Sequence, residues 1–181
     1  VDWRIVRSLA FAGAVGGALG AYVLASVDGD MIKPFVVGYL ALMGVVILYK
    51  TFRRPKPKPP VPARWLPTLG LSGGFLDAVG GGGWGPIVTS TLIGRGEQPR
   101  TVIGSVNLTE FFVTMTISAT FIFTIGLDDI RPVLGFIVGG IIAAPLAGLA
   151  VRVAPPQVLR TGVGVLVVAL SAIQTWRLVA G

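Results

Sequence analysis

The chain of 181 residues contains no cysteine and no histidine, and only 13% of its residues are charged. Without cysteine, disulfide bonds, thiolate catalysis and cysteine-based metal sites are excluded. Without histidine, the chain lacks the usual general base and the commonest metal ligand. We therefore expect neither a metal nor a cofactor. Enzyme function is disfavoured, because no nucleophile and base that could converge are present.

What the chain has in abundance is apolar sequence, with 53% hydrophobic residues and a mean hydropathy of +0.81. This composition excludes an ordinary soluble domain. Several apolar runs approach or exceed the roughly 20 residues that a helix needs to cross a bilayer. The sequence therefore predicts an all-α, polytopic transmembrane protein. We place its spans at residues 5–26, 33–49, 102–125, 130–153 and 157–179.

The sequence GGGGWGP at residues 80–86 interrupts a further apolar segment, 65–94. Consecutive glycines do not hold a helix, since each costs about 1 kcal/mol relative to alanine. In a bilayer, non-helical backbone survives only where protein buries it or where it lines a polar cavity. Pro86 suits the first turn of a new helix, whose free N–H groups attract anions. We predict a broken helix with an anion site at the break; the alternative is a tight turn that only permits close packing.

Positive charge concentrates in the segment 50–64, which also holds five prolines. Such a basic, extended linker is expected on the cytoplasmic side, so residues 51–64 separate two parts of the chain. The arms of segment 65–94 are about 15 and 8 residues long, which as helices would be roughly 22 Å and 12 Å. Each arm is thus shorter than the roughly 30 Å hydrocarbon core of a bilayer. We therefore predict that this segment enters the membrane and returns, which also places most basic residues on the cytoplasmic side.

The first two spans resemble the last two. The stretch AVGGALGAY (14–22) aligns with IVGGIIAAP (137–145), and VVGYLALMGVVIL (36–48) aligns with GVGVLVVALSAIQ (162–174). In the predicted topology the two pairs have opposite orientations, which is the inverted repeat typical of secondary transporters. Residues 1–50 would then end a first repeat, residues 65–181 would form the second, and a first hairpin is expected before Val1. Chance similarity between glycine-rich helices is the alternative.

No lysine or arginine falls in the middle of a predicted span, so a bound anion would depend on backbone N–H groups, hydroxyls and a helix dipole. Hydroxyl groups on the turns after Pro86 suit this role, although capping of the helix backbone is their alternative use. The predicted substrate-binding residues are Gly81, Gly82, Gly83, Trp84, Gly85, Thr89, Ser90 and Asn107.

Asp77 and Glu110 are the acids that lie inside apolar segments, which makes both functional candidates. Removal from water favours the protonated form of Glu110, so proton coupling is one hypothesis for it. The other is a structural carboxyl group that hydrogen-bonds the re-entrant segment. Asp77 lies three residues before the glycines, where it either caps freed backbone N–H groups or joins the coupling.

The stretch GGFLDAVGGGGWGPIVTSTLIGRGEQPR (73–100) and the stretch GSVNLTEFFVT (104–114) resemble the TauE/SafE family of sulfite and organosulfonate exporters. VDW at the start, GGALGA in the first span and the basic linker extend this resemblance over essentially the whole chain. It implies a permease of the bacterial inner membrane, built from two inverted halves. Members of the family usually carry the glycine motif in both halves, whereas this sequence shows it once.

The resulting expectation is export of sulfite, organosulfonates or related anions by alternating access, with proton coupling as an added hypothesis. The alternative is an accessory or scaffold subunit that kept the fold without transporting. Expected partners are the anionic substrate, membrane lipids and further copies or subunits of a membrane complex. The net charge of +7 is attributed to membrane topology and not to nucleic acid. Arg95, Glu97 and Arg100 are expected at the cytoplasmic mouth as topology anchors, with recruitment of anions as their alternative role.

Overall fold

The computed structural model describes residues 1–52, 61–82, 84–126, 130–153 and 155–180, and every regular element among them is helical. The five predicted spans correspond to α1 (Trp3–Ser26), α2 (Gly29–Phe52), α5 (Pro99–Ile125), α6 (Arg131–Val153) and α7 (Pro156–Ala180). Of these, α1, α2, α5 and α7 are long and apolar enough to cross a membrane, and α6 contains the shorter apolar stretch Val133–Leu146. The predicted all-α, polytopic fold is confirmed.

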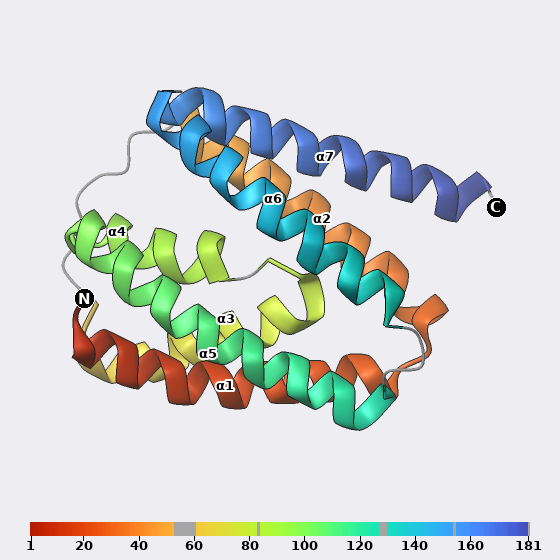
Figure 1. Cartoon of the computed structure of the whole chain (residues 1–181), viewed down its shortest axis with the longest axis horizontal. Helices are drawn as coiled ribbons and strands as arrows, with labels where there is room; N and C mark the ends of the chain where they lie inside the picture. The colour runs from red at the N-terminus through yellow and green to blue at the C-terminus, as the bar shows by residue number, and fades with distance from the viewer. Residues whose placement is uncertain (53–60, 83, 127–129, 154, 181) are drawn as a thin grey trace.

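The broken segment lies between α2 and α5. It contains a short turn, η1 (Ala63–Trp65), then α3 (Leu66–Gly80), a π-helical turn, η2 (Trp84–Thr89), and α4 (Ser90–Gly94). In Figure 1 the chain runs along α3 away from the end of the molecule that carries the N-terminus, bends, and comes back through α4 to that same end. The segment thus has the returning course that its two short arms predict.

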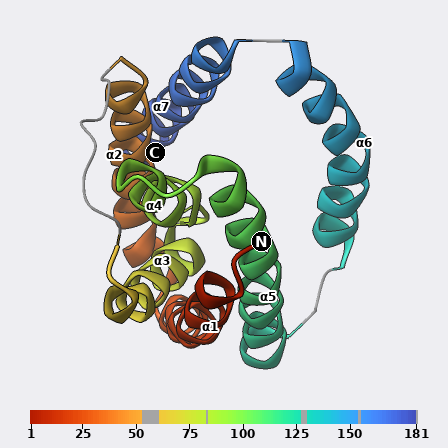
Figure 2. The ribbon, with the colours of Figure 1, turned by 90° about the vertical axis from the view of Figure 1, so that its left-hand side faces the viewer.

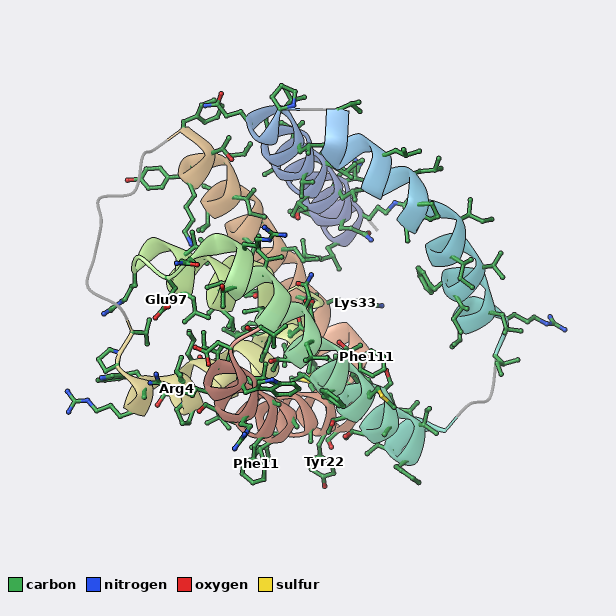
Figure 3. All side chains as sticks on the ribbon, turned by 60° about the vertical axis from the view of Figure 1, so that its left-hand side comes forward. Arg4, Phe11, Tyr22, Lys33, Glu97 and Phe111 are labelled. Carbon is green, nitrogen blue, oxygen red and sulfur yellow. The ribbon has the colours of Figure 1, made fainter. Side chains whose placement is uncertain are left out.

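Helix α1 packs against both α3 and α5, and small residues make its contact with α3 possible. A Cβ atom at Gly16 would overlap the carbonyl oxygen of Leu71, and one at Gly74 would overlap the carbonyl oxygen of Gly13. Backbone therefore lies directly on backbone, as is common where membrane helices meet. Phe11 and Tyr22 point away from the bundle on the opposite face of α1 (Figure 3), as expected for side chains that face lipid.

Helix α2 packs along α7. Helix α6 lies apart from α1, α3, α4 and α5 when the molecule is viewed from its N-terminal end (Figure 2). Large apolar side chains on all sides of α6 are exposed, including Phe136 and Val153. Among the described residues, the packed core therefore lies between α1, α3, η2 and α5, and the α2–α7 pair forms a second, smaller contact.

The α2–α7 contact has an internal two-fold character. Gly44 faces Val167 and Val168, while Gly164 faces Ile47 and Leu48. The hydroxyl group of Thr51 donates to the carbonyl of Ile47 at 2.8 Å, and the hydroxyl group of Ser171 donates to the carbonyl of Val167 at 2.8 Å. Each equivalent pair, such as Gly44 with Gly164, is 120 positions apart in the sequence.

This register differs from the alignment of residues 36–48 with residues 162–174, which pairs positions 126 apart. Small and branched apolar residues recur along both helices, so composition alone leaves the register open, and only the contacts fix it. The two helices run in opposite directions along their contact (Figure 1), as the equivalent helices of an inverted repeat do.

Basic side chains gather where the N-terminus, η1, the end of α4 and the start of α5 meet, and we call this the basic end. Its described members are Arg4, Arg7, Arg64, Arg95 and Arg100. Basic residues flanking membrane helices are retained in the cytoplasm, so we expect this end to face the cytoplasm.

This topology can be tested by cysteine labelling, because the chain has no native cysteine. Within the basic linker, position 57 would also suit a probe, but it lies outside the described residues. We therefore choose Ala63, which the structure places in η1. We expect Ala63→Cys and Gln98→Cys to react with an impermeant maleimide only from the cytoplasmic side, and Ile125→Cys, at the exposed end of α5, only from the outside. Labelling of positions 63 and 98 from opposite sides would contradict a returning hairpin.

Candidate functional site

The bend between the two arms depends on glycine for two different reasons. Gly81 ends α3 with φ of 67°, a left-handed conformation that favours glycine, and its N–H group donates to the carbonyl of Asp77 at 2.8 Å. Gly80 has no room for a side chain, because the ring of Tyr39 from α2 occupies that space. At Gly82, by contrast, a Cβ atom would meet nothing within 4 Å. Gly83 lies outside the described residues.

The second arm begins at Trp84, two residues earlier than the predicted start at Pro86. Proline is tolerated anywhere in a first helical turn, because its missing N–H group would have no partner there. The N–H group of Trp84 donates to Oδ1 of Asp77 at 3.3 Å, so the carboxylate holds the start of the arm in place. The capping alternative for Asp77 is thus confirmed. The N–H groups of Gly81 and Trp84 are both directed at Asp77 and are not left for a ligand.

The side chain of Trp84 belongs to the core of the hairpin. It is 1% exposed, and its Nε1–H group donates to the carbonyl of Val106 at 3.2 Å. Cβ atoms placed at Gly13 and Gly73 would meet its ring, so both glycines make room for the indole. Trp84 was predicted to bind substrate, but its ring faces the packed interior. We therefore assign it to support of the bend.

A cavity of about 400 Å³ lies between the bend and α5. It brings together five of the predicted site residues, which are Asp77, Gly81, Gly82, Gly85 and Glu110. Its other lining residues are Ala78, Thr114, Ile117 and Phe121. The contributions from α5 recur every three or four positions, which places them on one face of that helix. We call this space the bend cavity.

Besides Trp84, three described residues that were predicted to bind substrate do not line the bend cavity. The hydroxyl group of Ser90 reaches the carbonyl of Gly85 at 3.4 Å, so it caps backbone, as its alternative role proposed. Thr89 is half-buried in the second arm, and Asn107 is exposed on α5. Of the polar residues along this part of α5, Glu110 and Thr114 line the cavity, whereas Asn107 and Ser118 do not.

The polar groups of the bend cavity have few partners within the protein. In the described part of the chain, the carboxyl group of Glu110 makes no hydrogen bond or ion pair. The hydroxyl groups of Thr109, Thr116 and Thr120 donate to the carbonyl four residues before them on α5. Thr114 shows no such bond within the described residues, and its side chain lines the cavity. A carboxyl group and a hydroxyl group are therefore available to a ligand.

Tyr39 packs against the bend, although nothing in the sequence marked it as a neighbour of the glycines. Its hydroxyl oxygen is buried and has no hydrogen-bond partner among the described residues, while its ring lies against Gly80 at the bend. An unpaired buried hydroxyl costs free energy, so such groups call for a water molecule or a ligand. The only signal in the sequence was a single tyrosine within the apolar run 36–48.

A polytopic helical membrane protein with a broken, returning helix and a polar cavity at the break has the architecture of secondary transporters. The chain belongs to the TauE/SafE family, because the family model described as "Sulfite exporter TauE/SafE" matches residues 1–174. The multi-pass membrane location predicted from the sequence is thereby confirmed, and the bacterial inner membrane fits. A family of exporters also agrees with the prediction that the chain is not an enzyme.

The chain is 37% identical over 187 residues to the "Probable membrane transporter protein YtnM" of Bacillus subtilis (strain 168). The alignment covers 97% of this chain and 62% of that relative, so the chain spans less than two thirds of the relative's length. No solved structure shows significant similarity to the chain.

Proposed function

We propose that this chain takes part in the transport of small anions out of the cytoplasm, with sulfite, organosulfonates or related carboxylates as substrates. The observation that carries the proposal is the bend cavity, where the polar groups of Glu110 and Thr114 lie next to non-helical backbone at Gly82. Backbone of this kind persists inside a membrane protein where it lines a polar cavity. The family and the name of the bacterial relative support the same class of function.

The acidic lining of the bend cavity sets a condition on anion binding. Asp77 and Glu110 line the cavity, and none of the described residues that line it is basic. A charged carboxylate would repel an anion in so confined a space, whereas a protonated carboxyl group donates a hydrogen bond to it. We therefore propose that Glu110 is protonated while an anion is bound, whereas the N–H group of Trp84 offsets the charge of the Asp77 carboxylate. Binding of the anion and of the proton would then be coupled.

Alternating access requires a barrier on one side of the site. Towards the basic end of the hairpin, Trp84 and Val88 are fully buried and pack against Gly73. A packed layer of side chains therefore lies between the two arms of the hairpin. We propose that this layer closes the path to the basic end in this conformation, and that transport requires the arms to separate.

Filling the bend cavity tests the proposed site. Gly82 lines the cavity, and a Cβ atom there meets nothing within 4 Å, so in Gly82→Leu the fold should persist while the added side chain takes up space for a ligand. We expect sulfite efflux from proteoliposomes to fall at least about tenfold, because a filled site loses the contacts that held the ligand.

The matched control is Gly139→Leu in α6, where a Cβ atom also meets nothing within 4 Å and no cavity is filled. Both variants should elute as the unmodified protein does in size-exclusion chromatography. If Gly82→Leu transports as well as Gly139→Leu does, the glycine bend serves packing only. If the unmodified chain neither binds nor transports sulfite or alkylsulfonates, the accessory-subunit alternative is favoured.

A further inference from the structure

A second cavity, of about 390 Å³, lies at the basic end of the hairpin, between the first turns of α3 and the last turns of α4. Four of its lining residues are apolar, namely Val61, Pro62, Trp65 and Leu69. The other four supply three hydroxyl groups and a guanidinium group, from Thr68, Ser72, Thr91 and Arg95. We call this space the basic-end groove. It combines a cation, hydroxyl donors and an apolar surface within one cavity.

Most polar side chains of the basic-end groove have no hydrogen-bond or ion-pair partner among the described residues. Within the described residues, Arg95 makes no ion pair, and the hydroxyl groups of Thr68 and Thr91 make no hydrogen bond. Ser72 donates to the carbonyl of Thr68 at 2.9 Å, which leaves its oxygen able to accept only. Thr91 lies on α4 and Arg95 caps the end of that helix, and both line the groove.

Arginine is suited to hold an anion here. Its guanidinium group carries N–H donors in a planar fork that matches the oxygens of a carboxylate, sulfonate or phosphate. Arg95 is half-buried, which weakens competition from water relative to a surface arginine. The groove is also larger than a bare trioxyanion requires, and its apolar side chains offer contact to a hydrocarbon substituent.

We propose that the basic-end groove binds an amphiphilic oxyanion, with its head group on Arg95, Thr68 and Thr91 and its apolar part on Trp65 and Leu69. The groove is separate from the bend cavity, because the packed layer of Trp84 and Val88 lies between the arms of the hairpin. If the ligand is the transported anion, which rests on the proposed function, the groove holds it before the arms separate.

Two classes of molecule carry an oxyanion joined to an apolar part. A soluble organosulfonate or carboxylate carries an oxyanion on a short apolar tail, and so does the phosphate of an anionic lipid. The position of Trp65 at a helix end suits either source, since tryptophan is common at the membrane interface. The experiment must therefore vary the soluble anion and the lipid separately.

Trp65 provides the readout, because it lines the groove. The full chain in neutral detergent is titrated with butanesulfonate while tryptophan fluorescence is recorded. We expect a saturable change that disappears in Trp65→Phe. Arg95→Gln should raise the apparent Kd at least about tenfold, as expected for loss of a charge-assisted hydrogen-bonded pair. The matched control is Arg100→Gln, an exposed residue of the same end that does not line the groove, and it should leave the Kd within about twofold.

Repeating the titration in nanodiscs separates the two sources. If phosphatidylglycerol abolishes the response that phosphatidylcholine alone allows, the head group of an anionic lipid occupies the groove; if both give the same Kd, the soluble anion does. An unsaturable response, or equal Kd values for Arg95→Gln and Arg100→Gln, would overturn the proposal. Gly82→Leu should keep the Trp65 response, so failure of the proposed transport site and failure of the groove are distinguishable.

Discussion

Gly16→Ala is expected to destabilise the protein strongly, because the added methyl group would overlap the carbonyl oxygen of Leu71 on α3. The obstacle is backbone, which cannot rotate aside as a flexible side chain can, so α1 and α3 must move apart. Overpacking of this kind costs about 1–3 kcal/mol, and Gly74→Ala should cost a similar amount because it meets the carbonyl oxygen of Gly13. Thermal unfolding of the detergent-solubilised protein measures both effects.

The matched control is Gly38→Ala in α2. It is also a glycine inside a membrane-spanning helix, but a Cβ atom there meets nothing within 4 Å. Its stability should be unchanged or higher by up to about 1 kcal/mol, because alanine favours the helix. Equal melting temperatures for Gly16→Ala and Gly38→Ala would contradict the close contact between α1 and α3.

Glu110→Gln is expected to abolish the pH dependence of anion binding without abolishing binding. Glutamine has the size of a protonated glutamate and keeps a hydrogen-bond donor, so the anion meets a neutral side chain at every pH. In the unmodified protein, if one proton binds with each anion, the apparent Kd should rise about tenfold per pH unit once the proton is lost from the empty site. Affinity should thus fall as the pH rises, and in the variant it should stay flat.

Isothermal titration with sulfite at several pH values, corrected for the titration of sulfite itself, measures this dependence. Glu97→Gln is the control, because Glu97 lies at the basic end and does not line the bend cavity. It should keep the slope of the unmodified protein. A normal slope in Glu110→Gln would assign Glu110 a structural role and move the search for coupling to Asp77.

The class of the protein and the approximate position of the break follow from the order of the amino acids. Long apolar runs predict membrane helices, because a helix satisfies its own backbone hydrogen bonds in lipid. The run of glycines predicts a break in one of them, which the structure places after Gly80, and the short arms on either side favour a return to the basic end. Asp77 and Glu110 stood out because a carboxylic acid is costly inside a membrane and is retained there for a purpose.

Which of these residues meet depends on how the helices pack in three dimensions. In the folded protein, the ring of Trp84 lies in the core, where the indole fills space left by Gly13 and Gly73. The carboxylate of Asp77 is directed to the start of the second arm, and Asn107 is left on the surface. A sequence pattern gives the face of a helix, but the neighbour of that face depends on packing between helices distant along the chain. For the same reason the sequence did not predict the contact of Tyr39 with the bend. It also did not predict the groove around Arg95, which forms between the two arms of one hairpin.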